Sequence, residues 1–284
     1  MTAVLASLAS AAFYGAADFV GGLAARRAHT LVVVALAQLS GLIALGLVVP
    51  FLPASTPTTR DWIWGAAAGL TGGIGVALLY RALAIGTMAV VAPITAVCAV
   101  VVPVAASLAL GERLGTATLS GIALAIVAIV LVSRQNAPDD VNADRAARGR
   151  AVATAFGSGV AIGFFFLTLA QTRADAGMWP LVAARGLSSA MFIALAFAAH
   201  GTMRLPARIG AAVVAGGVLD ILANVLYLLA TRYGPLSVVV TLSSLYPAST
   251  VLLARFVLGE RLSATQTVGV ICALAAVMMI VGTR

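Results

Sequence analysis

Residues 82–114 read ALAIGTMAVVAPITAVCAVVVPVAASLALGERL, and this stretch decides the class of fold. It carries no charged side chain before Glu112 and Arg113. About 20 consecutive apolar residues suffice for an α-helix to cross a bilayer, so the stretch predicts a membrane-spanning helix that ends at this pair of charges. Further uncharged stretches cover 28–59, 114–133, 151–172, 186–203, 233–254 and 262–283. Such a series is typical of a protein that crosses the membrane many times.

The composition of the whole chain leads to the same class. Of its 284 residues, 62% are apolar and 9% are charged, whereas soluble globular proteins have about 45–50% apolar and about 25% charged residues. The net charge of +8 comes from arginines that are scattered at the ends of the apolar stretches. Nucleic-acid binding requires a concentrated basic face. We therefore expect the lipid bilayer as a partner and no nucleic acid.

Ten spans can be drawn from the apolar stretches and the residues that break them. The β-strands of a membrane barrel would be about half as long and would alternate polar with apolar residues, and these stretches do not alternate. The prediction is an all-α membrane protein with ten transmembrane helices. Their approximate ranges are 3–24, 31–52, 62–84, 88–110, 116–133, 151–171, 178–199, 209–231, 235–258 and 264–282.

The tetrapeptide that ends the opening stretch occurs a second time in the chain. Gly-Glu-Arg-Leu stands at 111–114 and at 259–262, and at the same offset Gly86 matches Gly234 and Gly15 matches Gly163. The polar linker 134–150 separates a first repeat, 1–133, from a second, 151–284. Each half has five predicted helices. Because five is odd, the second half must cross the membrane in the opposite sense, which is the inverted-repeat plan of many secondary transporters.

Two five-helix halves with G-E-R-L between their fourth and fifth helices resemble the EamA-type members of the drug/metabolite transporter superfamily. The stretches V-V-A-P-I-T at 90–95 and S-L-Y-P-A at 244–248 belong to the same resemblance, which covers the whole chain. It implies a secondary transporter that moves a small organic metabolite or drug-like solute across a bacterial cell membrane by alternating access. A proton-independent facilitator and a non-transporting membrane scaffold remain as alternatives.

An enzyme is not expected, because the sequence contains no G-x-S-x-G elbow, no H-E-x-x-H and no P-loop. We accordingly expect no catalytic residues, no metal, no cofactor, and a monomer. The orientation in the membrane stays open. The arginines of the loops place both termini outside the cell by the positive-inside rule, whereas the family resemblance implies cytoplasmic termini. The side that holds both predicted termini is called side A below, and the opposite side is called side B.

Charged side chains far inside a membrane are costly and are functional candidates by default. Arg185 and Asp220 are predicted at similar depths on the neighbouring seventh and eighth helices. They form a structural ion pair, or Arg185 binds substrate and is steadied by Asp220, or the two residues are unpaired and have separate roles. Asn224 follows Asp220 by four residues and so shares its helix face, and Tyr227 lies near that face. Weaker candidates for lining a cavity are Tyr246, Tyr80, Gln38, Thr95, Ser243 and Ser244.

Asp18 and Arg81 are predicted near the side-B ends of the first and third helices. They form either an ion pair, or Arg81 reaches the headgroups while Asp18 faces a water-filled mouth. Asp18 is also a candidate for proton coupling, since small multidrug resistance proteins, distant relatives in the same superfamily, use an acidic side chain of their first helix in this way. Pro93, Pro103 and Pro247 should interrupt the fourth and ninth helices. They provide either the bends for gating or fixed kinks that aid packing.

Overall fold

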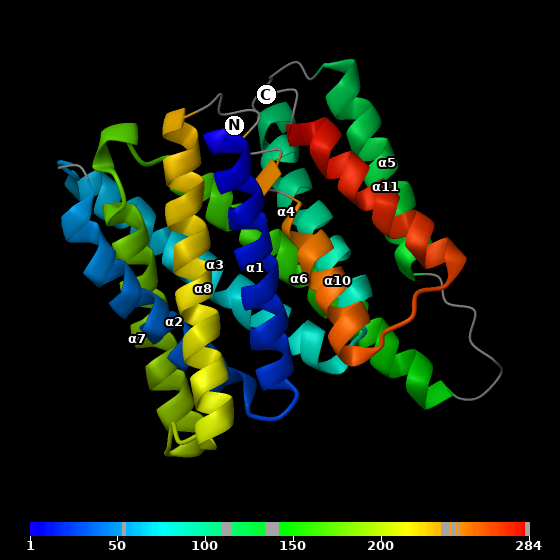
Figure 1. Cartoon of the computed structure of the whole chain (residues 1–284), viewed down its shortest axis with the longest axis horizontal. Helices are drawn as coiled ribbons and strands as arrows, with labels where there is room; N and C mark the ends of the chain where they lie inside the picture. The colour runs from blue at the N-terminus through cyan, green and yellow to red at the C-terminus, as the bar shows by residue number, and fades with distance from the viewer. Residues whose placement is uncertain are drawn as a thin grey trace.

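The structure, a computed structural model, describes residues 1–52, 55–109, 115–133, 142–233, 239, 242–243 and 245–281. All regular structure within these residues is helical, and the long helices form a bundle (Figure 1). The α-helices are α1 (Thr2–Ala25), α2 (Thr30–Val48), α3 (Thr59–Ile85), α4 (Met88–Ala109), α5 (Thr116–Ser133), α6 (Asn142–Leu169), α7 (Trp179–His200), α8 (Ala207–Tyr233), α10 (Tyr246–Leu258) and α11 (Ala264–Val281).

Six of these helices are long and apolar enough to cross a membrane: α1, α2, α3, α6, α7 and α8. Apolar helical stretches of 10–17 residues lie in α4, α5, α10 and α11. The protein is therefore a multi-pass membrane protein with an all-helical fold. The start of α1 and the end of α11 lie toward the same end of the bundle, at the top of Figure 1.

Two predicted boundaries differ from the structure. Residues 142–150, predicted as part of the linker, form the first turns of α6, since this segment is rich in Ala and Arg, which are strong helix formers. The predicted span 235–258 contains α10 only from Tyr246, and Pro247 lies in the first turn of this helix. The N–H groups of a first turn have no partner within the helix, so proline is tolerated there. Helical residues also occur at 239 and 242–243, and Leu245 forms a turn, so the helical structure is interrupted beside Pro247.

Glycines allow α3 to pack closely on α7. A Cβ atom on Gly69 would lie 2.3 Å from the carbonyl oxygen of Ala184, and one on Gly65 would lie 2.5 Å from that of Pro180. Gly73 continues the same face of α3 against Ser188. Small residues spaced four apart let two helix backbones approach in a membrane, where no hydrophobic effect drives the helices together. This packing fixes the position of α7.

The two parts of the chain interlock throughout the bundle. Four helices from before the linker pack against four helices from after it. The pairs are α1 with α8, α2 with α7, α3 with α6, and α5 with α11. The carboxylate of the buried Asp61 adds a polar connection on side A. It accepts hydrogen bonds from the main-chain N–H of Thr58 and of Arg173, each at 2.8 Å. One acidic residue thus caps the start of α3 and holds the loop before α7.

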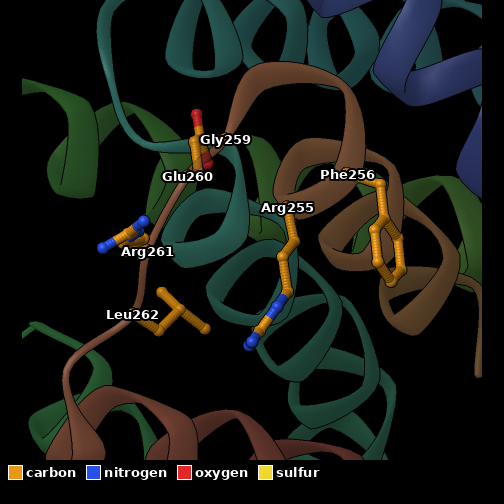
Figure 2. Close-up of a pocket in the computed structure, with 6 residues that line it drawn as sticks. All are labelled: Arg255, Phe256, Gly259, Glu260, Arg261 and Leu262. Atoms are coloured by element: carbon orange, nitrogen blue, oxygen red, sulfur yellow. The ribbon is translucent and has the colours of Figure 1, made fainter.

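A second acidic residue connects the two parts of the chain on side B. The helix α10 ends at Gly259, which has a left-handed φ of 66°, and Glu260 donates its N–H to the carbonyl of Ala254 at 3.2 Å in a Schellman turn. The Glu260 carboxylate accepts the N–H groups of Met88 and Ala89 at 3.2 and 3.0 Å. Glu260 therefore caps the start of α4, from the turn shown in Figure 2.

Arg26 completes this contact, which we call the side-B junction. Its guanidinium group forms an ion pair with Glu260 at 3.2 Å. It also donates hydrogen bonds to the carbonyl oxygens of Leu83 and Gly86 at 3.1 and 3.0 Å. The junction therefore joins the end of α1, the end of α3, the start of α4 and the turn before α11. The first copy of G-E-R-L, at 111–114, lies outside the described residues.

Candidate functional site

The candidate site lies where α2, α7 and α8 meet. The close approach of α8 to α2 depends on Gly217, because a Cβ atom there would lie 2.3 Å from the carbonyl oxygen of Ala37. Gln38 follows Ala37 on α2, and Asp220 lies three residues after Gly217 on α8. Arg185 comes from α7, which is held in place by the glycines of α3. Packing of small residues thus brings three polar side chains together in the interior of the bundle.

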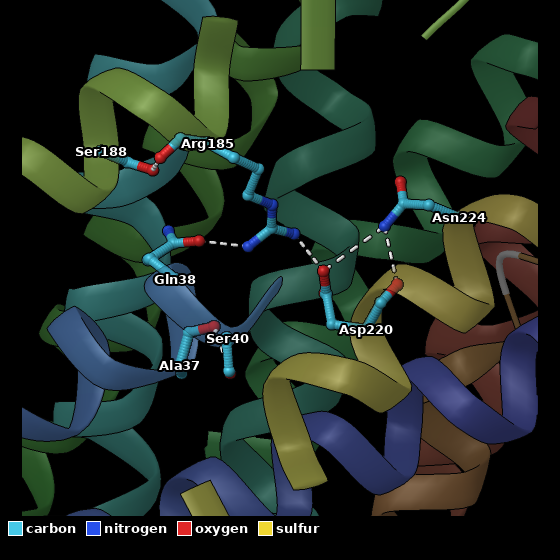
Figure 3. Close-up of polar contacts among 7 residues, drawn as sticks. All are labelled: Ala37, Gln38, Ser40, Arg185, Ser188, Asp220 and Asn224. Atoms are coloured by element: carbon cyan, nitrogen blue, oxygen red, sulfur yellow. Dashed lines mark hydrogen bonds and ion pairs between the residues drawn. The ribbon is translucent and has the colours of Figure 1, made fainter. Parts of the chain in front are cut away.

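These side chains form one hydrogen-bonded network, which Figure 3 shows. The guanidinium group of Arg185 forms an ion pair with the carboxylate of Asp220 and donates a second hydrogen bond to the side-chain oxygen of Gln38. Asn224 donates to the main-chain oxygen of Asp220 at 2.7 Å and to its carboxylate at 3.4 Å. The ion pair that sequence reasoning considered is therefore present, and Asn224 lies on the same face of α8 as expected.

The ion pair is not sealed from its surroundings. The exposed fraction of the side chain is 16% for Arg185 and 25% for Asp220. A guanidinium group has five N–H donors, and two of them are used in this network. One turn after Arg185, the buried hydroxyl of Ser189 has no hydrogen-bond partner among the described residues. The network therefore keeps hydrogen-bonding capacity that a solute could use.

Asp18 lies on α1 among tyrosines. Tyr14 precedes it by four residues on the same helix face, and the ring of Tyr14 meets that of Tyr246 edge-on, with centroids 6.3 Å apart. One turn later, Gly21 gives room for the ring of Tyr80, whose Cζ atom would lie 2.1 Å from a Cβ atom at this position. Asp18 lies within electrostatic range of these tyrosines and of Asp220. Tyr227 is partly buried and packs against the apolar cluster of Ala3, Ala230 and Val239.

The structure does not bring Asp18 and Arg81 together. Within the described part of the chain, Asp18 forms no hydrogen bond or ion pair. Arg81 is exposed and lines a surface hollow near the start of α6. It also lies near His29, whose pKa is lowered by partial burial and by the neighbouring His200 and Arg81. The structure therefore has Arg81 at the side-B surface and not in the alternative arrangement, an ion pair with Asp18.

The remaining predicted residues are two prolines of α4 and three residues with hydroxyl side chains. Pro93 and Pro103 lie inside α4, where each removes a main-chain hydrogen bond. The hydroxyls of Thr95 and Ser243 donate to the main-chain oxygens of Ala155 and Ser7, at 3.2 and 3.5 Å. Those two hydroxyls therefore serve helix packing. Ser244 lies outside the described residues.

Sequence reasoning gave Gln38 little weight and missed Tyr14, Arg26 and the contacts of Glu260. Gln38 had a usable signal, because it is the only side-chain amide in the uncharged stretch 28–59. Tyr14 could have been found from its spacing of four from Asp18. The partners of Arg26 and Glu260 are far apart in sequence, so only the fold connects them. Among the described residues, no group of three His, Cys, Asp or Glu side chains could hold a metal ion.

Comparisons with known proteins show the family to which this chain belongs. The sequence model of the EamA-like transporter family matches residues 1–134 and again residues 149–282. Among curated proteins, none matches the chain. One solved crystal structure aligns with 95% of this chain and 95% of its own, at a TM-score of 0.55 and 17% identity, so the likeness concerns the fold alone. The family match covers nearly all of the sequence in two halves, and the chain belongs to the EamA-like transporter family.

Proposed function

We propose that the protein is a secondary transporter of a small organic solute, which binds at the network of Arg185, Asp220 and Gln38 and crosses a bacterial cell membrane by alternating access. The observation that supports this most directly is the partly exposed ion pair between membrane-spanning helices. Ionisable groups at such depth are costly and usually line a substrate or ion pathway. A protein that served only as a scaffold would have no need of them.

The network also connects the two halves of the chain. Gln38 belongs to α2, before the linker, whereas Arg185 and Asp220 belong to α7 and α8, after it. A solute that bonds to the unused guanidinium N–H groups would therefore contact a joint between the halves. Asn224, Tyr227 and Tyr246 supply further polar groups for solute binding from α8 and α10.

Ten spans in two inverted repeats are part of this proposal. The packing supports it, because equivalent pairs recur. If α1 corresponds to α6 and α3 to α8, then the contact of α1 with α8 is equivalent to that of α6 with α3, and both contacts are extensive. If α2 likewise corresponds to α7, then the contact of α2 with α8 is equivalent to that of α7 with α3, and both of these contacts are also extensive. In Figure 1, α1 and α6 run in opposite directions through the bundle. Pro93 and Pro103 each remove a main-chain hydrogen bond from α4, which would let this helix serve as a hinge.

We assign Asp18 to proton coupling within this mechanism. Asp18 lies within electrostatic range of Asp220, and among the described residues the guanidinium group beside them, that of Arg185, is paired with Asp220. With both carboxylates ionised, Asp18 carries the uncompensated charge. Taking up a proton would neutralise it, as acidic groups do in proton-driven transporters. Arg81, at the surface, has no part in this step.

The experiment begins with a metabolite screen on cells with and without the gene, followed by uptake of the identified solute into proteoliposomes. Arg185→Gln and Asp220→Asn should each abolish uptake. The exposed ion pair of Arg173 and Asp175 gives a matched control, because its side chains are 49% and 54% exposed. Arg173→Gln and Asp175→Asn should transport normally. Equal uptake by all four variants and the wild type would refute the binding site.

The coupling step is tested separately in the same vesicles. Asp18→Asn should lose accumulation driven by a pH gradient but keep exchange of solute across the membrane. Normal accumulation by this variant would identify a proton-independent facilitator. A protein that changes no metabolite level in cells and moves no solute in vesicles would instead be a non-transporting membrane protein.

A further inference from the structure

A hollow of about 510 Å³ lies on side B between the end of α10 and the turn that follows it. Its lining residues are Arg255, Phe256, Gly259, Glu260, Arg261 and Leu262 (Figure 2). It lies at the end of the bundle where a membrane protein meets the lipid headgroups.

Large apolar side chains are exposed on α10, beside the hollow, and on α11, the next helix along the chain. Both α10 and α11 pack on α4, yet they hardly touch each other. They diverge on the right of Figure 1, with α4 behind them. On α10, Leu252 is 53% exposed and Phe256 is 79% exposed, and on α11 Ile271 is 61% exposed. Apolar side chains that are exposed to this extent require the hydrocarbon chains of lipids beside them.

Two cations border the hollow without a protein partner. Arg255 and Arg261 are exposed, and neither forms a hydrogen bond or ion pair with any residue that the structure describes. Glu260 does not neutralise them, because its carboxylate is bound by Arg26 and by the N–H groups of Met88 and Ala89. In Figure 2 its side chain points away from both arginines. The hollow is therefore positively charged.

We propose that this hollow is a binding site for an anionic membrane phospholipid, with the phosphate between Arg255 and Arg261 and an acyl chain along the exposed apolar side chains of α10. Charge complementarity argues for the anionic headgroup, since guanidinium groups bind phosphate oxygens strongly. The exposed side chains of Phe256 and Leu252 argue for a lipid over a free anion, because a soluble phosphate would leave them uncovered. Basic pockets between membrane helices hold acidic headgroups in this way.

The test is a titration of delipidated protein in neutral detergent, with bound lipid counted by native mass spectrometry. The probes are phosphatidylglycerol and phosphatidylcholine with identical acyl chains, and inorganic phosphate. Two interfacial arginines should favour the anionic lipid by about tenfold or more. The double variant Arg255→Gln/Arg261→Gln should lose this preference. The exposed Arg27 and Arg204 give a matched control on the same side, and Arg27→Gln/Arg204→Gln should keep the preference.

A third variant separates the two parts of the proposed site. Phe256→Ser should weaken binding of phosphatidylglycerol while both arginines remain. The proposal is overturned by equal affinity for the two lipids, by a preference that survives in Arg255→Gln/Arg261→Gln, or by a loss in the control variant of the same size. Binding of inorganic phosphate as tight as that of the lipid, unaffected by Phe256→Ser, would identify a simple anion site. Size-exclusion profiles of all variants confirm that they are folded.

Discussion

Removing the carboxylate of Glu260 should destabilise the protein more than removing any exposed acidic side chain. In the native state this group accepts two main-chain N–H bonds at the start of α4 and pairs with Arg26, with an exposed fraction of 13%. Glu260→Ala leaves the start of α4 uncapped, which costs about 0.5–2 kcal/mol. It also removes a charge-assisted hydrogen bond to Arg26, which contributes about 1.5–3 kcal/mol when well shielded.

Together these terms predict a loss of about 2–5 kcal/mol in the free energy of unfolding. Glu260→Gln should cost about half as much, because its amide oxygen can still accept an N–H bond from the start of α4 although the charge is lost. Arg26→Gln should cost a similar amount. In the double variant the losses should not add, because the two residues share one ion pair.

The measurement is reversible unfolding in mixed micelles, followed by tryptophan fluorescence from the 3 Trp residues. Asp175→Asn is the matched control, since it removes an exposed ion pair that contributes about 0–1 kcal/mol. The reasoning is refuted if Glu260→Ala is no less stable than the control, or if the effects of Glu260→Ala and Arg26→Gln are strictly additive.

Three further predictions follow from the packing and the loops. Gly69→Leu should unfold the contact of α3 with α7 and lower the yield of folded protein, whereas Gly46→Leu should be tolerated because no atom lies within 4 Å of a Cβ there; equal yields would contradict this packing. Because the folded-state pKa of His29 lies below its ordinary value of 6.5, its contribution to stability should be complete above pH 6.5 and decline as the pH falls from there toward the lowered pKa; His29→Gln should flatten this dependence in thermal unfolding scans, and an unchanged slope would count against it. Cysteines introduced at positions 2 and 283, with Cys98 and Cys272 replaced, should be labelled from the same side of the membrane, and labelling from opposite sides would exclude ten spans.

Much of the architecture was predictable because the bilayer imposes a simple rule. A chain that buries its main-chain polar groups in hydrocarbon must form helices or a closed barrel, and the long uncharged stretches around residues such as Leu45 and Val91 allow only helices. The rule fails where a helix is short or broken. Pro247 was predicted inside a long helix because the apolar stretch continues on both sides of it. Its position in the first turn of α10 depends on local hydrogen bonding that composition does not report.

The sequence by itself determined that the chain is an all-helical membrane protein, that it is built from two related halves, and that Arg185 and Asp220 are its unusual deep charges. These properties follow from the cost of placing charged and polar groups in hydrocarbon, which acts on each residue separately. Only the tertiary structure decided which charges meet. It pairs Arg185 with Asp220 and Gln38, leaves Asp18 among tyrosines and separates it from Arg81, and brings Glu260 to the start of α4. Such contacts depend on helix rotation and on close approach at glycines such as Gly217, and spacing along one helix cannot specify the face that a distant helix presents.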